Sequence, residues 1–354
     1  MRLRRIAATD RRRLARICCG TPFCGVMKWG SLKEVSGCSM GYERRHPDPV
    51  FMYGALRSGT TLLRLMLLQH SRIHSPGEAD YLFDHLSPDP AAPLGVRCDR
   101  AGLAADWKFK LADLPLPQGP ENADLVHALN DVIHDRAPDG VTTVSVHRSA
   151  VFMARLFPRA RVIHLLRDPR DSARSAVGMG WDGNSYHGVR HWLDTETAWD
   201  AADIPPDQVL TVRFEELIRD LEAGLTEICA FMGLEFEPRM LDYHKVSTYA
   251  PPDPKISQKW RTEASPREIG LIQGRVGALL EARGYDSVGG AVAPGAAAKT
   301  WLRIDDKARR WRYNIRRYGL GLWLSQHAAR ALRLRGTADR LAARQLDIKI
   351  QNLK

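Results

Sequence analysis

The chain of 354 residues lacks a run of about 18 apolar residues, the length that a membrane-spanning helix requires. Its six cysteines are few for its length, which argues against a disulfide scaffold. The repeated C-x-x-C spacing of a structural zinc site is also missing. We therefore expect a cytoplasmic protein with reduced thiols that requires no metal.

Acidic residues are scarce at both ends of the chain. Residues 1–49 carry a net charge of +7 and residues 299–354 a net charge of +11, which leaves −7 for the segment between them. The arginine-rich start has only a short apolar stretch, broken by glycine and proline, so we expect a flexible leader and not a signal peptide. Charge alone permits nucleic-acid binding, but no recognition motif is visible and we expect none.

Apolar strand-like segments alternate with amphipathic helical segments through the middle of the chain. This alternation predicts an α/β fold, a P-loop-like parallel sheet flanked by helices. We expect a basic leader at 1–48, one α/β domain at 49–287, a linker rich in glycine, alanine and proline at 288–299, and a basic helical extension at 300–354.

The segment VFMYGALRSGTTLLRLMLLQH, residues 50–70, has a strand-like start, a glycine turn and an amphipathic helical run. Gly54 and Gly59 have the spacing of a Walker A loop, G-x-x-x-x-G-K-[ST]. The lysine position of that motif is Thr60, and Arg57 lies inside the loop instead. Because the first N–H groups of a helix attract anions, the segment predicts an anion site in which Arg57 supplies the charge. A plain turn that joins a strand to a helix is the alternative.

A second segment, RVIHLLRDPRDSARSA, places Arg167 at the end of a predicted strand and Ser175 about one turn into the following helix. In open α/β sheets ligands lie at the carboxyl ends of the strands. The two side chains are therefore predicted to converge on a second phosphate. An ordinary ion-pairing arginine and a surface serine are the alternative.

Together, ALRSGTTLLRLML and IHLLRDPRDSARSA resemble the 5′- and 3′-phosphosulfate-binding signatures of sulfotransferases that use 3′-phosphoadenosine 5′-phosphosulfate (PAPS). The segments VRFEELIRDLEAGLTEICAFMGLEFEP and KISQKWRTEASPREIGLIQGRVGALLEARGYD are similar to later parts of the same family. The resemblance covers about residues 48–287 and is closest to the tyrosylprotein-type and bacterial members.

The resemblance implies a nucleotide site with the residues Arg57, Ser58, Gly59, Thr60, Thr61, Arg167, Ser175 and Lys259. It implies that the backbone of residues 58–61 holds the 5′-phosphosulfate and that Arg167 and Ser175 hold the 3′-phosphate. Arg57 would contact the bridging oxygen, where charge builds up as the sulfuryl group leaves. For Lys259 a surface lysine beside a tryptophan is the alternative.

The resemblance also implies that Glu78 is the base for the acceptor hydroxyl. A carboxylate suits this role if burial raises its pKa toward neutrality. A glutamate that bonds backbone N–H groups at a helix start is the alternative reading. The rivals as base are Asp80, Asp84, His85, His70 and His74.

The chain departs from the family pattern in two places. The lysine of a K-x-P segment is missing from TTVSVHRSA, where neither His147 nor Arg148 aligns cleanly with it. Phe214 replaces the tyrosine of a "YE" pair, so that hydroxyl contact is lost.

The leading hypothesis is transfer of the sulfuryl group of PAPS to a hydroxyl or amine, which releases adenosine 3′,5′-bisphosphate. A P-loop kinase and a non-catalytic protein that binds a nucleotide or a membrane surface are the alternatives. The acceptor stays open among a carbohydrate, a glycolipid, a tyrosine and a small metabolite. The amphipathic C-terminal helices suit peripheral membrane contact, packing on the core, or contact with a second subunit in a homodimer.

Overall fold

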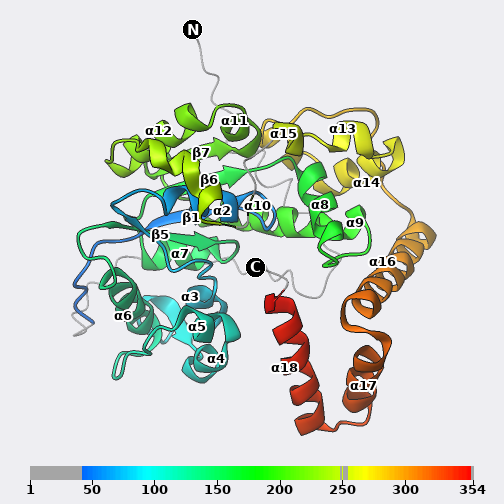
Figure 1. The fold of residues 1–354 in the computed structure, drawn as a ribbon, viewed down its shortest axis with the longest axis horizontal. Coiled ribbons are helices and arrows are strands. Elements are labelled where there is room, and N and C mark those ends of the chain that lie inside the picture. The colour runs from blue at the N-terminus through cyan, green and yellow to red at the C-terminus, as the bar shows by residue number, and fades with distance from the viewer. Residues whose placement is uncertain (1–41, 248, 250–253, 352–354) are drawn as a thin grey trace. The chain divides into compact units, whose positions relative to one another are not determined.

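A five-stranded parallel sheet forms the centre of the fold (Figure 1). The strands follow the spatial order β2-β5-β1-β6-β7. Their bounds are Val50–Tyr53 (β1), Ile73–His74 (β2), Val141–Val146 (β5), Val162–Leu166 (β6) and Val209–Arg213 (β7). Each neighbouring pair is parallel, with Phe51 of β1 opposite Val144 of β5 and Val162 of β6. The expected α/β fold with a parallel sheet is confirmed.

This computed structural model describes residues 42–247, 249 and 254–351. Most of the expected leader and four of the six cysteines lie outside the described residues. The other two cysteines, Cys98 and Cys229, are buried and unpaired. Burial raises the pKa of each thiol to about 11, so both behave as packing residues rather than as nucleophiles.

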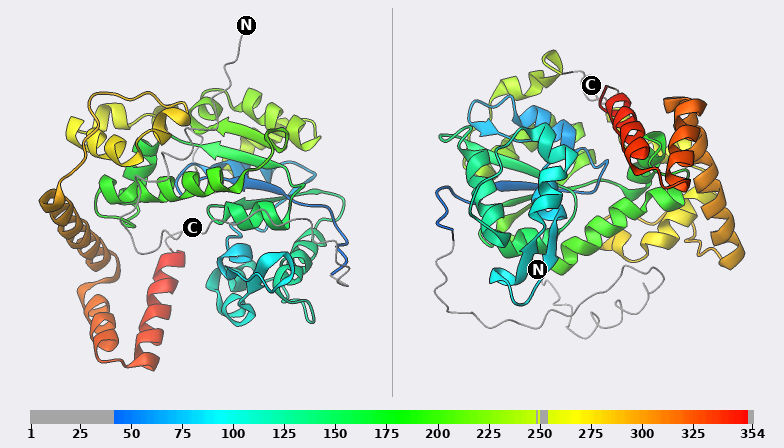
Figure 2. Two further views of the ribbon diagram at one scale, coloured as in Figure 1. Left: turned by 180° about the vertical axis from the view of Figure 1, so that it is seen from behind. Right: turned by 90° about the horizontal axis from the view of Figure 1, so that it is seen from below.

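Helices cover both faces of the sheet (Figures 1 and 2). Phe51 and Tyr53 of β1 enter one apolar core, and Val50 and Met52 enter the other, because successive strand residues point to opposite faces. The first core includes residues of α3 (Tyr81–Asp84), α6 (Asn122–His134) and α7 (Ala150–Leu156). The second includes residues of α2 (Thr60–Leu67), α11 (Phe214–Arg219) and α12 (Leu221–Met232).

The remaining elements before the C-terminal helices have at most 13 residues each. The helices are α4 (Arg100–Ala105), α5 (Trp107–Ala112), α8 (Pro169–Gly178), α9 (Ser185–Gly188), α10 (Arg190–Ala202), α13 (Trp260–Glu263), α14 (Pro266–Val276) and α15 (Leu279–Ala282). Leu86–Pro88 (β3) and Val96–Cys98 (β4) form an antiparallel pair. Short 3₁₀ helices occupy Pro93–Gly95, Pro206–Gln208, Pro238–Lys245 and Pro254–Ile256. A third apolar cluster, which joins α8, α10 and α14, includes Ala55 and Trp192.

Three helices end the chain: α16 (Ala296–Tyr318), α17 (Leu320–Ala331) and α18 (Arg335–Gln351). The loop before α9 binds α16 directly, since the Gly183 N–H donates to Asp306 (2.7 Å) and the Asn184 amide donates to the Leu302 carbonyl (2.8 Å). Gly183 permits this approach, because a Cβ there would lie 2.2 Å from the Asp306 carbonyl oxygen. The expected extension therefore contacts the α/β core, while the expected domain boundaries stay a prediction.

No helix within the part of the chain that the structure describes is both long enough and apolar enough to cross a bilayer.

Candidate functional site

The turn between β1 and α2 has the geometry of an anion-binding loop. Gly59 adopts a left-handed φ of 98° and begins α2, and no side chain caps the first turn of that helix. Its N–H groups are thus available to an anion. A side chain at Gly59 would also collide with Phe214, because a Cβ would lie 2.4 Å from the ring. Phe214, which stands in place of the family tyrosine, thus packs directly on the loop.

Arg57 connects this loop to the second predicted phosphate site. Its Nε donates to the Ser175 hydroxyl on α8 (3.0 Å). Its own carbonyl accepts from the Arg167 guanidinium (2.9 Å), which lies just after β6. Arg57 has a left-handed φ of 74°, an uncommon conformation for a residue with a side chain and one found often at functional sites. The two sequence segments are therefore adjacent.

The Arg167 side chain is fixed in position beside the loop. Its guanidinium carbon lies 4.4 Å from the centre of the Phe214 ring, and a second guanidinium nitrogen donates to the Ile256 carbonyl (3.1 Å). Its Nε is buried without a partner among the described residues. Burial lowers the pKa of Arg167, and the carboxylates of Asp171 and Glu215 oppose that change. An arginine stays charged under such a shift, so Arg167 keeps a positive charge at the wall of the site with one N–H still unpartnered.

A cleft of about 610 Å³ brings these groups together. The predicted site residues that line it are Arg57, Gly59, Thr60, Thr61, Glu78, Arg167, Ser175 and Lys259. Ser58 differs from them, because its side chain is buried and its backbone N–H donates to the Ala55 carbonyl (3.0 Å). Trp181, which the sequence did not single out as a nucleotide contact, also lines the cleft, with the Arg57 guanidinium 5.6 Å from its ring centre.

Lys259 lies at the edge of the cleft, just before α13. The next residue, Trp260, is buried, and its backbone N–H donates to Asp171 (2.9 Å). Its ring lies 3.6 Å from the guanidinium carbon of Arg170. The tryptophan is thus the structural member of the Lys-Trp pair, and it leaves the lysine exposed at the cleft.

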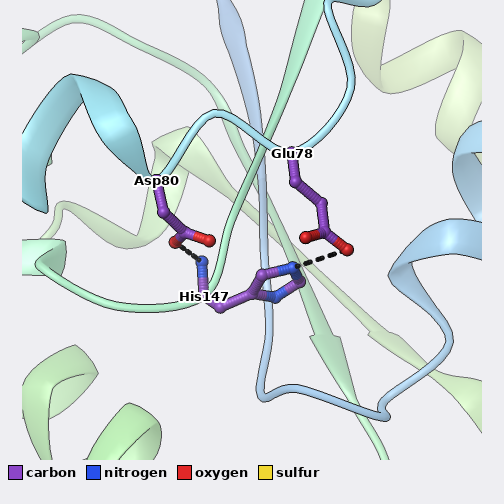
Figure 3. Close-up of side chains that lie close together, drawn as sticks. All are labelled: Glu78, Asp80 and His147. Carbon is purple, nitrogen blue, oxygen red and sulfur yellow. Dashed lines mark hydrogen bonds and ion pairs between the residues drawn. The ribbon is translucent and has the colours of Figure 1, made fainter. Parts of the chain in front are cut away.

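Glu78 lies in a second group of charged residues (Figure 3). One carboxylate oxygen is 3.8 Å from Nε2 of His147, and the other is 3.2 Å from the Lys108 ammonium. Lys108 also contacts Asp80 (3.4 Å), whose other oxygen accepts from the His147 backbone N–H (2.8 Å). His147 follows β5, and its Nδ1 donates to the Gly54 carbonyl (2.9 Å). This bond directs Nε2 toward Glu78 in either protonation state.

The pKa of Glu78 is lowered to about 2, mainly by the facing His147 imidazole and further by Lys108, against the effect of burial. Burial alone would lower the pKa of His147, but Glu78 and Asp80 outweigh it and the net shift is upward. The sequence argument expected burial to raise the pKa of Glu78. The structure gives the opposite direction, because a histidine and a lysine from distant segments face the carboxylate.

The rival bases lie outside the cleft, and three of them, Asp84, His85 and His70, have partners elsewhere. Asp84 forms two hydrogen bonds with Arg148, each of 2.6 Å, so Arg148 does not replace the missing lysine in the cleft. His85 pairs with Asp106 (3.0 Å), and His70 donates to the Glu235 carbonyl (2.9 Å). None of the rivals, Asp80, Asp84, His85, His70 and His74, is among the described residues that line the cleft. Glu78 and His147 both line it.

Lys108 is the charged neighbour that sequence reasoning missed. It is the second residue of α5, where the Asp106 carboxylate accepts from its backbone N–H (2.7 Å). No motif links it to Glu78, 30 residues earlier. Ligand atoms of Glu78, Asp80 and His147 lie within 4.8 Å of one another, a spacing that suits a metal ion. The Lys108 ammonium already bridges both carboxylates, however, so we assign no metal to this group.

Comparison with known proteins agrees with this geometry. A model of the "Sulfotransferase family" matches residues 49–238. Protein-tyrosine sulfotransferase A of Caenorhabditis elegans is 26% identical over 233 residues, which cover 58% of this chain and 55% of that protein. Protein-tyrosine sulfotransferase 2 of Gallus gallus is 24% identical over 220 residues, 56% of this chain and 54% of that protein. The chain thus spans about half the length of these two relatives.

A solved sulfotransferase domain from the curacin biosynthetic pathway has the same fold, with a TM-score of 0.53 at 19% identity. The match covers 69% of this chain and 100% of that domain. The family match spans more than half of the chain and includes the β1–α2 loop, Glu78, and the segment from Arg167 to Ser175. The chain therefore belongs to the sulfotransferase family.

Proposed function

We propose that this sulfotransferase takes its sulfuryl group from PAPS and transfers it to an acceptor hydroxyl. One observation carries the proposal: Arg57, Arg167 and Ser175 meet at one cleft, at the uncapped start of α2. An anion loop without the Walker lysine suits phosphosulfate, which has less charge at its transferred end than a triphosphate. A separate arginine–serine pair suits the second phosphate of the nucleotide.

The residues present fit the two ends of PAPS. The N–H groups of residues 59–61 would hold the 5′-phosphosulfate at the start of α2. The unpartnered Nε of Arg167 and the Ser175 hydroxyl would hold the 3′-phosphate. Lys259, at the edge of the same cleft, would add a further contact to the nucleotide. Each of these groups is a donor or a cation, as an anionic ligand requires.

In the proposed reaction the acceptor oxygen attacks sulfur while the bond from sulfur to the bridging oxygen breaks. The electron pair of that bond stays with the 5′-phosphate, which leaves as adenosine 3′,5′-bisphosphate. Arg57 would stabilise the charge that develops on the bridging oxygen. This contribution is larger in the transition state than in the ground state, so Arg57 would act mainly on kcat.

The acceptor proton would pass to Glu78. A carboxylate with a pKa of about 2 is a weak base for a free hydroxyl. The hydroxyl becomes strongly acidic as its oxygen bonds to sulfur, so transfer to Glu78 becomes favourable late in the step. His147 and Lys108 would keep the carboxylate ionised and oriented before the acceptor binds. In this assignment Glu78, His147 and Lys108 together perform the role of the lysine that the family pattern has and this chain lacks.

Several acceptors are compatible with this proposal: a carbohydrate, a glycolipid, a tyrosine and a small metabolite. The two relatives named protein-tyrosine sulfotransferases make tyrosine one candidate to test. Exposed large apolar residues gather in the C-terminal helices and the turn between α17 and α18, which supports a peripheral membrane contact and a lipid-linked acceptor. They are Trp301, Ile304, Trp311, Leu320, Leu324, Leu332 and Leu334. A homodimer and a cytoplasmic location stay predictions.

The first test is calorimetric binding of adenosine 3′,5′-bisphosphate in EDTA for the wild type and for Arg167→Ala. Loss of the charged contact should weaken binding by roughly 1.5–3 kcal/mol. Arg219→Ala is the matched control, because Arg219 is exposed on α11 and lies outside the cleft. Absence of binding, or binding of ATP alone and only with Mg²⁺, would contradict the proposal and favour a kinase.

A further inference from the structure

The C-terminal helices line a second, open cavity of about 390 Å³ that shares no lining residue with the cleft around Arg57 and Arg167. Residues of α16, α17 and α18 all line it, and consecutive helices contact one another. Figure 1 shows these helices in orange to red at the end of the chain. We call this space the helical cavity. Its position leaves it without a role in sulfuryl transfer as proposed above.

Polar side chains without partners converge on the helical cavity. Gln326 of α17 lines it and is only 5% exposed, yet its amide has no hydrogen-bond partner among the described residues. Asn314 of α16 and Gln345 of α18 also line the cavity, and within the described chain neither side chain has a recorded hydrogen bond. Buried amides are nearly always hydrogen-bonded in folded proteins, because an unpaired one costs free energy. A polar ligand or water is the expected partner of the Gln326 amide, and the partly exposed amides of Asn314 and Gln345 are open to the same ligand.

Aromatic rings form another part of the wall. Trp311 and Trp323 meet edge to face with their ring centres 5.6 Å apart, and Tyr318 lies in the same lining. Trp311 is 41% exposed, so part of its indole is open to a ligand. Indole and phenol rings offer an apolar face beside a polar N–H or O–H. Such a face packs well against the C–H side of a sugar ring.

The charge of the lining is positive. Lys307, Arg310, His327 and Arg330 belong to it, and no carboxylate does among the residues that the structure describes. The charge of Arg310 is partly neutralised by Asp306 (2.7 Å), and the Lys307 ammonium lies 4.8 Å from the Trp311 ring centre. Arg330 forms no ion pair with any residue that the structure describes. The cavity therefore favours an anion, and its cations suit a sulfate or phosphate ester.

We propose that the helical cavity binds an acidic carbohydrate, a ring polyol that carries sulfate or phosphate esters. The three amides match hydroxyl groups, the indoles match the ring, and the cations match the ester. Two sources supply this chemistry: a free sugar ester and the headgroup of a lipid such as a phosphorylated phosphoinositide. The proposal does not depend on the identity of the donor nucleotide, because the two cavities share no residue.

The test is calorimetry on the full chain with sucrose octasulfate as the soluble probe. Gln326→Leu removes the buried amide without a change of charge, and we expect about tenfold weaker binding. Arg316→Gln is the matched control, because Arg316 is exposed on α16 and does not line the cavity. Asn314→Ala serves as a second cavity variant if Gln326→Leu fails to fold.

Sedimentation with phosphatidylcholine vesicles that contain a phosphatidylinositol phosphate distinguishes the two sources. If the protein associates with the vesicles and Gln326→Leu weakens this association, the ligand is the lipid headgroup. If the protein binds the soluble probe but does not associate with the vesicles, the ligand is a free sugar ester. No binding of either probe overturns the proposal. Equal losses with Arg316→Gln and Gln326→Leu also overturn it, because they indicate attraction to the basic helices in general.

Discussion

Arg57 and Ser175 are 118 residues apart in the sequence, and a hydrogen bond of 3.0 Å joins the Nε of one to the hydroxyl of the other. Arg57 belongs to the loop after β1, and Ser175 to α8 after β6. Because β1 and β6 are parallel neighbours, their carboxyl ends open on the same edge of the sheet. The proposed contacts to the 5′-phosphosulfate and to the 3′-phosphate are therefore directly linked. Mutation of each residue in turn distinguishes their roles.

Substitution of Arg57 should affect turnover more than binding. We expect Arg57→Ala to lower kcat by about 10²–10³, the usual effect of removing a donor that stabilises developing charge. Ser175→Ala should instead weaken binding of adenosine 3′,5′-bisphosphate by roughly tenfold and leave kcat nearly unchanged. The measurement is steady-state kinetics beside calorimetry for both variants. Weaker binding with an unchanged kcat in Arg57→Ala would place this arginine in ground-state binding only.

Glu78 should make stability depend on pH in the acid range. Its pKa falls from 4.5 to about 2 on folding, so its contribution is complete above about 4.5 and is lost as the pH falls toward 2. We expect Glu78→Gln to be less stable than the wild type at pH 6, with the difference shrinking toward pH 2. Urea denaturation at several pH values measures this. Glu227→Gln, an exposed change on α12, should show no such convergence.

His147 should act through Glu78. Its own pKa is raised, so it stabilises the pair most at low pH and loses that effect as the pH rises through its folded-state pKa. Without the histidine, the pKa of Glu78 should rise toward its ordinary value of 4.5. We therefore expect the acid limb of kcat/KM in His147→Gln to move to higher pH. A uniform loss of rate with an unmoved acid limb would indicate that His147 itself takes the proton.

Gly59 should be harder to replace than another left-handed glycine. Gly59→Ala combines strain at a φ of 98° with a clash against Phe214. Gly77 has a φ of 94° with nothing within 4 Å of a Cβ, so Gly77→Ala reports the strain alone. We expect Gly77→Ala to cost about 1–2 kcal/mol of unfolding free energy and Gly59→Ala clearly more. Thermal unfolding compares them, and equal losses would show that the Phe214 contact relaxes freely.

The contact between α16 and the loop before α9 should support the nucleotide site. Asp306 is 4% exposed and accepts from the Gly183 N–H, two residues after Trp181. We expect Asp306→Ala to release this loop and to weaken nucleotide binding several-fold, in the same direction as Trp181→Ala. Calorimetry measures both, with the exposed Asp207→Ala as control. Unchanged affinity in Asp306→Ala would confine the α16 contact to stability.

Much of the donor side could be read from local sequence. A strand, a glycine turn and a helix lie within a few residues of one another, so the order of residues already defines the loop around Gly59. Arg167 and Ser175 likewise sit on one strand end and the helix that follows. The parallel sheet was predictable because its central strands are apolar on both faces, as a sheet covered by helices requires.

The state of Glu78 could not be read in this way. The sequence placed Glu78 near the first helix and suggested burial as the influence on its pKa. The direction depends on Lys108 and His147, which lie 30 and 69 residues further along the chain. No pattern in either segment shows that Lys108 and His147 face the Glu78 carboxylate. Only in the folded chain do their charges outweigh the effect of burial on the pKa of Glu78.

The chain thus encodes its family, its parallel sheet and its two anion-binding segments in short stretches, where backbone geometry and side-chain type act over a few residues. Tertiary structure alone decided three other features: the ionised Glu78 cluster, the packing of α16 beside Trp181, and the helical cavity. The first two arise where distant segments exclude water from one another, and the third where three consecutive helices pack at an angle that no local pattern sets. Electrostatic and packing energies then depend on neighbours in space and no longer on neighbours in sequence.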